Sequence, residues 1–215
     1  MKYRLAIFDM DGTILDTIQD LTDALNHTLR AYSLPEHSVS AVMFMVGNGI
    51  HKLIERAVPE GVSVELIEKV YTDYLPYYQE HCADATKPYK GIVSIIQRLR
   101  SLGILTAVVS NKKDAAVSEL CEIYFKDCFD AAVGERDGMQ RKPAPDSVFE
   151  VLKKLGVRKE DAVYIGDSDV DLKTAENAGM DVIAVTWGFR SKEFLAEHGA
   201  TVFARTPEDL IALIR

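Results

Sequence analysis

Leu5–Phe8 is a run of four apolar residues that leads directly into two aspartates, Asp9 and Asp11. The run is too short for a helix and lacks polar alternation, so it predicts a strand buried on both faces. Such strands belong to parallel sheets covered by helices, in which ligands bind beyond the carboxyl ends of the strands. Gly12 then lets the backbone turn sharply and bring its amide close to an anion. This stretch therefore limits the fold and marks the place where a site is expected.

The same residues allow a second interpretation, because Asp-Gly-Thr is common turn chemistry and on its own favours a simple turn. Two carboxylates that lie close together repel each other and are tolerated best beside a cation or with one proton held. A functional role for Asp9 and Asp11 therefore depends on partners elsewhere in the chain.

Residues 16–83 have helical periodicity and contain no segment with a strand pattern. Thr17 and Asp20 have the spacing of a capping box, which predicts a helix start. The further helices expected here begin near Ser38, Ile50 and Ser63, and Pro76 is expected to kink or split the last one. We therefore expect an all-helical domain over residues 16–87, inserted into a core made of residues 1–15 and 88–215.

From Ile92 onward, helix and strand patterns alternate, which is typical of a parallel sheet covered by helices. The expected strands cover residues 104–109, 131–133, 162–165, 182–185 and 201–203. The expected helices cover residues 92–101, 113–123, 146–155, 170–178 and 191–198, and a last one starts at Thr206-Pro207-Glu208. The predicted fold is α/β, with a Rossmann-like parallel sheet core interrupted once by the helical insert.

The net charge of −8 and the lack of basic runs argue against a nucleic-acid partner or an anionic membrane surface. The three cysteines lack metal-ligand spacing and suit reduced thiols. No apolar run approaches membrane-spanning length and we recognise no signal peptide, so a cytoplasmic protein is expected. The expected assembly is a monomer or a homodimer. Because the overall charge repels phosphate, a phosphorylated substrate would need local lysines or a metal ion.

Polar groups follow three of the predicted strands: Asp9 follows the first, Ser110 the second and Asp167 a later one. The carboxyl ends of parallel strands meet along one edge, so these residues are expected to converge. The acid-rich loop 166–171 can cap the next helix, but capping needs only one of its three acids. Together with Asp9 and Asp11 these acids repel one another unless a hard cation lies among them, and oxygen-only ligands suit Mg²⁺.

Two further segments offer donors or positive charge. Ser110 and Asn111 are expected to open the helix after their strand, where a hydroxyl and free amides form a phosphate site. A plain Ser N-cap explains that pattern equally well. Arg141 and Lys142 precede Pro143, which can hold one of them as a fixed counter-charge, although most surface lysines are merely solvated. The residues themselves do not decide between Arg141 and Lys142.

Taken in order, these signals resemble the four motifs of the haloacid dehalogenase superfamily of phosphotransferases. The matching segments are Asp9-Met10-Asp11-Gly12-Thr13, Ser110, Lys142 within Lys142-Pro143, and Gly166-Asp167-Ser168-Asp169-Val170-Asp171. The helical insert between the first and second motifs is similar to the C1 cap of that superfamily. The resemblance implies that Asp9 attacks phosphorus to form an aspartyl-phosphate. It implies that Asp11 acts as general acid and then as general base.

The resemblance also implies the remaining parts of the site. Mg²⁺ would be the cofactor, held by Asp9, the main-chain carbonyl of Asp11 and Asp167. Ser110 would bind a phosphoryl oxygen, and Lys142 would neutralise both the phosphate and Asp9. From outside the metal's own ligands, Asp171 would orient Lys142 or a metal-bound water. The other core residues expected to contact the substrate are Gly12, Thr13 and Asn111.

The insert resembles the cap segment of phosphoglycolate phosphatases over residues 45–50 and 53–57, and residues 186–190 are similar to the same group. Gly47 and Gly49 free the backbone around Asn48, so the next helix can direct its amides at a small acid, with Lys52 or Arg56 nearby. The substrate-binding residues expected in the cap are therefore Gly47, Asn48 and Lys52. An ordinary helix–turn–helix explains this segment equally well. The expected substrate is a small phosphorylated metabolite, with 2-phosphoglycolate first.

Other functions stay open on the same scaffold, namely a pyrophosphatase, a nucleotidase or a hexose-phosphate mutase similar to β-phosphoglucomutase. A phosphonoacetaldehyde hydrolase is disfavoured because the insert shows no clear Schiff-base lysine. A receiver-like switch that accepts a phosphoryl group also has acids, a hydroxyl and a lysine at strand ends, but it lacks a helical insert. A silent binding protein would not need both Asp9 and Asp11.

Overall fold

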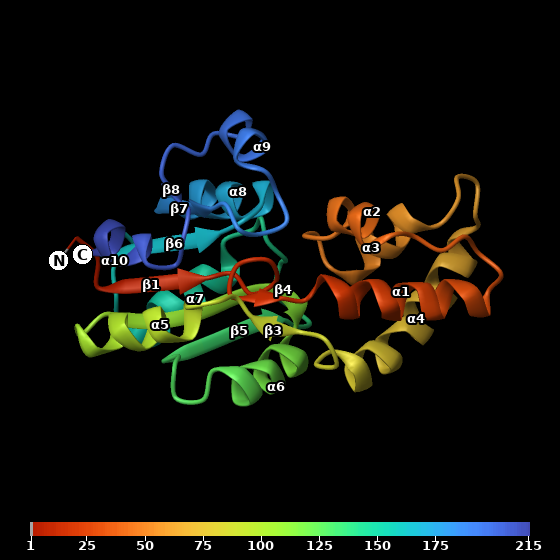
Figure 1. Ribbon diagram of the computed structural model, residues 1–215, viewed down its shortest axis with the longest axis horizontal. Helices are drawn as coiled ribbons and strands as arrows, with labels where there is room; N and C mark the ends of the chain where they lie inside the picture. The colour runs from red at the N-terminus through yellow and green to blue at the C-terminus, as the bar shows by residue number, and fades with distance from the viewer. Residues whose placement is uncertain (1) are drawn as a thin grey trace. The chain divides into compact units, whose positions relative to one another are not determined.

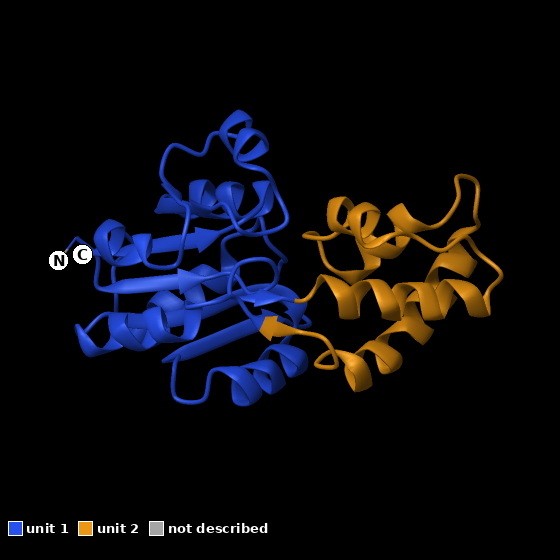
Figure 2. Cartoon of the chain, viewed as in Figure 1, with its two compact units in different colours: residues 1–16, 88–215 blue, residues 17–87 orange. Residues whose placement is uncertain are grey.

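The structure, a computed structural model, describes residues 2–215. The chain divides into two compact units, which Figure 2 colours separately. Unit 1 comprises residues 1–16 and 88–215, and unit 2 comprises residues 17–87. Where the chain leaves and re-enters unit 1, β2 (Leu15–Asp16) pairs with β3 (Lys87–Pro88) in a two-stranded sheet. No strand was expected in residues 16–83. This expectation is wrong for Asp16, which belongs to β2, and it holds for the other residues of that range.

Within the described residues, unit 1 contains a six-stranded sheet with the order β5-β4-β1-β6-β7-β8 (Figure 1). Its strands are β1 (Leu5–Phe8), β4 (Leu105–Lys113), β5 (Ala131–Glu135), β6 (Ala162–Gly166), β7 (Asp181–Val185) and β8 (Phe203–Ala204). All five neighbouring pairs are parallel. The predicted α/β class with a Rossmann-like parallel sheet is confirmed. Because β1 lies between β4 and β6, the carboxyl ends of those two strands flank its own.

Helices connect the strands, as parallel pairing requires crossover connections. The connecting helices are α5 (Ile92–Ser101), α6 (Asp114–Tyr124), α7 (Asp146–Leu155), α8 (Asp169–Ala178) and α9 (Lys192–Glu197), with a short 3-10 helix at Lys159–Asp161. A further helix, α10 (Asp209–Ile214), follows the last strand, β8. Gly156 and Gly179 end α7 and α8 with φ of 64° and 67°, a left-handed conformation that favours glycine. None of the helices in the described part of the chain has the length and apolar character needed to span a bilayer.

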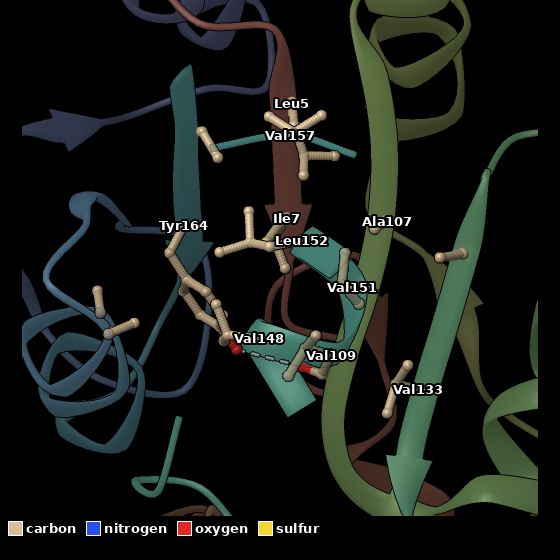
Figure 3. Packing of buried hydrophobic residues seen from close by; sticks show 14 residues of the cluster. Leu5, Ile7, Ala107, Val109, Val133, Val148, Val151, Leu152, Val157 and Tyr164 are labelled. Carbon is tan, nitrogen blue, oxygen red and sulfur yellow. Dashed lines mark hydrogen bonds between the residues drawn. The ribbon is translucent and has the colours of Figure 1, made fainter. Parts of the chain in front are cut away.

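The core on one side of the sheet joins β1, β4, β5 and β6 to α7 and α8 (Figure 3). Leu5 and Ile7 of β1 are fully buried in it. Because side chains alternate along a strand, Asp9 continues the direction of Leu5 and Ile7 one residue beyond the end of the strand. Tyr164 of β6 lies in the same core, and it is the only residue of this buried cluster with a polar side chain among those described.

Unit 2 is built from α1 (Ile18–Ala31), α2 (Val39–Met45), α3 (Ile50–Ala57) and α4 (Val64–His81). Its predicted helices are present, and α4 continues through Pro76 as one helix rather than two. The predicted capping box is wrong, because the Thr17 side chain makes no capping hydrogen bond. The buried carboxylate of Asp20 instead accepts hydrogen bonds from the amides of Ala85 and Thr86, both at 2.8 Å. A partner distant in sequence has displaced the local one.

The strand β4 is longer than predicted and carries an irregularity in its pairing with β5 between Val109 and Lys113. The expectation that Ser110 and Asn111 open a helix is therefore wrong, since α6 begins at Asp114. Ser110, Asn111 and Lys112 are all buried, and contacts with other segments keep this part of the chain extended. Smaller differences occur near the end of the chain. There β8 (Phe203–Ala204) begins two residues after the start of the predicted strand, and α10 begins at Asp209 rather than at Pro207.

Candidate active site

The three predicted strand-end groups lie on adjacent strands of unit 1. Asp9 follows β1, Ser110 lies in the last part of β4, and Asp167 follows β6. All three are buried, with 8% of Asp9, 5% of Ser110 and 1% of Asp167 exposed. The main-chain amide of Asp9 donates to the carbonyl of Ile165 at 2.9 Å, which fixes the end of β1 against β6. The sheet thus brings together residues that are far apart in sequence, at the edge predicted to hold a ligand.

Asp9, Asp167 and Asp171 form a buried carboxylate cluster, with one oxygen of each lying within 4.8 Å of the others. Burial, followed by the negative charge of Asp171, raises the pKa of Asp9 well above its ordinary value. Burial, again followed by the charge of Asp171, raises the pKa of Asp167 to about 7. Burial and the closeness of the carboxylates thus both disfavour the charged forms of these acids. A hard divalent cation would supply positive charge there.

Lys142 provides the positive charge that the protein itself places among these acids. Its Nζ lies 2.8 Å from Oδ1 of Asp9 and 2.8 Å from Oδ1 of Asp171. Burial opposes the charge of the ammonium, but the carboxylates of Asp171 and Asp9 outweigh it and raise the pKa of Lys142 well above its ordinary value. Arg141 points elsewhere, because its guanidinium binds Glu135 at 2.8 Å. The structure therefore decides the choice between Arg141 and Lys142 that the sequence leaves open.

Asp171 connects this charge network to the start of α8. Ser168 is the N-cap of that helix, and its hydroxyl accepts from the amide of Asp171. The Asp171 carboxylate accepts in return from the amide of Ser168 at 3.1 Å and from its hydroxyl at 2.6 Å, which completes a capping box. A Cβ on Gly166 would lie 2.3 Å from the Asp171 side chain. The loop 166–171 thus caps a helix and also holds the acid that binds Lys142.

Asp167 is held from two sides by residues distant in sequence. The Thr13 hydroxyl donates to its Oδ1 at 3.1 Å, and the Phe189 amide donates to its Oδ2 at 2.7 Å. Gly12 and Gly188 lie so close that a Cβ on either would come within 2.4 Å of Asp167. The backbone of the first motif and of residues 186–190 therefore forms a narrow cradle around this carboxylate. Trp187 adds a further hydrogen bond between these two segments, since its Nε1 donates to the carbonyl of Thr13 at 3.0 Å.

Asp11 lies apart from the carboxylate cluster and pairs with a residue that the sequence motifs did not single out. The Nζ of Lys112 lies 3.0 Å from Oδ1 of Asp11, and Lys112 is buried whereas Asp11 is partly exposed. The hydroxyl of Ser110 accepts from the main-chain amide of Lys112 at 3.2 Å, so Ser110 contacts the backbone of the residue whose side chain binds Asp11.

Asn111, expected to contact the substrate, binds the main chain of Lys142. Its Oδ1 accepts from the Lys142 amide at 2.8 Å, and its Nδ2 donates to the Lys142 carbonyl at 3.1 Å. Asn111 is buried, as is Lys142. Each end of the Asn111 carboxamide is thus used to hold the segment that carries Lys142.

The three residues expected to bind substrate from the insert lie in unit 2, around the loop between α2 and α3. Gly47 has a φ of 115°, which favours glycine at that position. The Oδ1 of Asn48 accepts from the Arg56 guanidinium at 2.8 Å, and Arg56 also donates to the carbonyl of Met45 at 2.6 Å. Lys52 forms an ion pair with Glu55 on the exposed side of α3. Arg56 therefore orders the loop that contains Gly47 and Asn48.

Comparison with known proteins identifies the family. Residues 6–185 match the family model of haloacid dehalogenase-like hydrolases. The chain belongs to this family. The resemblance predicted from the four motifs is therefore confirmed, and the matched region includes all of them and the helical insert.

Relatives of this haloacid dehalogenase-like hydrolase are named as phosphatases. Phosphoglycolate phosphatase 1 of Pseudomonas aeruginosa is 31% identical over 97% of the chain and 78% of its own length. Phosphoglycolate phosphatase of Aquifex aeolicus is 32% identical over 86% of both chains. The crystal structure of a Lactobacillus delbrueckii subsp. bulgaricus protein, provisionally assigned as a phosphoglycolate phosphatase, superposes with a TM-score of 0.96 at 42% identity, over 100% of this chain and 99% of that one. The chain is an enzyme of the phosphatase type within its family.

Several residues of this hydrolase's site were not anticipated from the sequence. They are Lys112 beside Asp11, Tyr164 beside Lys142, and the Gly188-Phe189 backbone beside Asp167. Lys112 directly follows Ser110-Asn111, and Tyr164 is the only polar side chain in an otherwise apolar strand, so both carried a weak signal. The backbone contact to Asp167 carried none, because a main-chain amide has no side chain to recognise.

Proposed function

We propose that this chain is a Mg²⁺-dependent phosphomonoesterase that works through an aspartyl-phosphate on Asp9 and acts on a small anionic substrate such as 2-phosphoglycolate. The observation that supports it best is the buried carboxylate of Asp9, bound by the Lys142 ammonium at 2.8 Å and lying beside Asp167. An anionic nucleophile can approach a negatively charged phosphoryl group only where positive charge compensates both.

The residues present fit a magnesium ion. The buried cluster offers only oxygen atoms, and burial together with the charge of Asp171 raises the pKa values of Asp9 and Asp167, which supports a bound cation. Asp9, Asp167 and the main-chain carbonyl of Asp11 would hold the ion. Asp171 is engaged with Lys142 and with the helix cap, which supports a role outside the metal's ligands. When bound, the ion would supply positive charge for the phosphoryl oxygens and would orient the substrate.

The protein's own groups then divide the two half-reactions between them. An oxygen of Asp9 forms a bond to phosphorus as the bond from phosphorus to the ester oxygen breaks, and Asp11 gives its proton to the leaving alkoxide. Asp11 next removes a proton from the water that attacks phosphorus, which frees Asp9 and releases phosphate. Lys142 balances the charge of Asp9 throughout, and the Ser110 hydroxyl can donate to a phosphoryl oxygen.

The substrate assignment rests on different support. Relatives named phosphoglycolate phosphatase match the chain over most of its length. We further propose that unit 2 is a cap, and that Gly47, Asn48 and Lys52 contribute to binding the acid end of the substrate. Arg56 supports this proposal because it orders the loop that carries Asn48. A cytoplasmic location is also proposed, in keeping with three cysteines that form no disulfide in the described structure.

The test is phosphate release from a panel containing 2-phosphoglycolate, hexose phosphates, nucleoside monophosphates and pyrophosphate, measured with Mg²⁺ and with EDTA. We expect Mg²⁺-dependent release that is fastest from 2-phosphoglycolate, and none above background from Asp9→Asn. Release in EDTA would refute the metal requirement, and release from Asp9→Asn would refute the nucleophile. A preference for another monoester would refute the substrate assignment alone, and no release from any compound would refute the phosphatase.

A further inference from the structure

The ammonium of Lys142 has three N–H donors and no acceptor, and the described structure supplies three acceptors for it. Two are the charged oxygens of Asp9 and Asp171, both at 2.8 Å. The third is the hydroxyl of Tyr164, at 3.1 Å. Each N–H of this buried ammonium can therefore point at its own partner. Tyr164 is the one neutral member of the set, and burial raises its pKa well above the ordinary value, so it stays neutral.

The direction of the Tyr164 hydroxyl is itself fixed. Its proton is donated to the main-chain carbonyl of Val109 at 3.2 Å, as Figure 3 shows. This leaves a lone pair to accept from Lys142. Val109 belongs to β4 and Tyr164 to β6, and β1 lies between these two strands. The hydroxyl therefore joins the two strands that flank β1. The sheet thus fixes the acceptor for the third N–H of the ammonium, and the two carboxylates accept the stronger, charge-assisted hydrogen bonds.

The main chain of Lys142 is held as well. The Asn111 carboxamide both accepts from the Lys142 amide and donates to the Lys142 carbonyl. A pair of opposed hydrogen bonds of this kind restrains both the position and the rotation of a peptide segment. Asn111 therefore fixes the base of the side chain whose tip Tyr164 holds.

We propose that Tyr164 and Asn111 are positioning residues that act through Lys142, neither of them touching the substrate. The inference rests on the proposed function, because Lys142 matters there as the fixed counter-charge of Asp9. Without the Tyr164 hydroxyl one N–H of a buried ammonium loses its partner, and the ammonium can turn away from its hold on Asp9. Nucleophile geometry would then suffer while substrate binding would not, since misplacement of reacting groups lowers the rate of the chemical step.

Tyr164→Phe is the decisive variant, because it removes only the hydroxyl. The ring remains, and its centroid lies 5.6 Å from Nζ of Lys142, so the packing and any cation–π attraction are retained. We expect kcat for the best substrate of the panel to fall about tenfold, with KM changed less than about twofold. Tyr3→Phe is the matched control, since it also removes a hydroxyl hydrogen bond from a buried tyrosine, to Asp181 at 2.6 Å and away from the site. Its kcat should equal that of the unmodified protein.

Asn111→Ala tests the second half of the proposal. We expect a fall in kcat without a rise in KM, whereas a residue that binds substrate would mainly raise KM. Because both side chains act through Lys142, the fall in the Asn111→Ala, Tyr164→Phe double variant should be smaller than the product of the single falls. If Asn111→Ala does not fold, as judged by circular dichroism, Tyr164→Phe and its control decide the question alone.

Three results would overturn the inference. One is a Tyr164→Phe enzyme whose kcat matches that of Tyr3→Phe. Another is a change confined to KM in either variant of the site. The last is a double variant whose loss equals the full product, which would mean that the two residues act independently. An unmodified protein with no activity on any compound would instead refute the proposed function, and this inference with it.

Discussion

At the scale of single residues, the charged side chains of the site are held in place by close contacts with their neighbours. Asp167 accepts from Thr13 and from the Phe189 amide while two glycines press against its side chain. A carboxylate held in this way keeps one orientation, which a metal ligand requires. The position of the Asp167 side chain therefore requires a glycine at position 188.

Gly188→Ala tests this contact. The new Cβ would lie 2.3 Å from Cβ of Asp167 and 2.3 Å from the carbonyl oxygen of Gly12, so one of these must move. We expect the protein to lose about 1–3 kcal/mol of unfolding free energy in urea. We also expect its Mg²⁺-dependent phosphate release to fall at least about tenfold, because misplaced catalytic groups slow the chemical step.

Gly103→Ala is the control for this variant. Gly103 has a φ of 80° with open space around its Cβ position, so alanine there costs about 1–2 kcal/mol through backbone strain alone. Its activity should match that of the unmodified protein. Full activity in Gly188→Ala, or an equal loss of activity in Gly188→Ala and Gly103→Ala, would show that the contact with Asp167 does not matter for catalysis.

At the scale of helices and strands, most of the architecture could be predicted from the sequence, because local patterns and packing agree. Buried strands in a parallel sheet are continuous apolar runs, and glycines mark the ends of α7 and α8. Ser110 and Thr17 were misjudged for a shared reason. The helix expected at Ser110 begins later, and the helix expected at Thr17 is present but lacks the capping box, because tertiary contacts hold Asn111 and Asp20 in other roles. No local pattern reveals such distant partners.

Asp20 offers a test at this scale, because it ties α1 to the segment through which the chain returns to unit 1. Its carboxylate is buried and accepts from two amides, those of Ala85 and Thr86. Asp20→Ala leaves both without this acceptor, and we expect it to lower the urea unfolding free energy by about 2–4 kcal/mol. Asp23→Ala, on the same helix, is the control. Asp23 is exposed and, within the described structure, accepts only from Gln19, so we expect Asp23→Ala to lower the unfolding free energy by less than about 0.5 kcal/mol. Equal losses of unfolding free energy in the two variants would show that the hydrogen bonds of Asp20 to the Ala85 and Thr86 amides do not stabilise the protein.

At the scale of the whole molecule, the chain consists of a parallel-sheet unit that carries the acids and Lys142, and a helical unit encoded between β2 and β3. The strand-end rule predicted which residues of unit 1 would converge, because topology alone brings those ends together. It could not predict that Asn111 and Tyr164 would be directed at Lys142, since this depends on side-chain packing. Substrate choice in unit 2 had the weakest support, because a glycine-rich loop suits both a ligand site and an ordinary turn.

The central claim is that Asp9 carries the phosphoryl group during turnover. The most direct measurement is to quench the enzyme with acid during turnover of its best substrate, reduce it with borohydride and locate the modified residue by peptide mass spectrometry. Because borohydride reduces an acyl phosphate to an alcohol, a phosphorylated Asp9 would be found as homoserine at position 9. We predict homoserine at that position alone, dependent on substrate, and its absence from Asp9→Asn. Homoserine at another position, or none from an enzyme quenched during active turnover, would contradict the account.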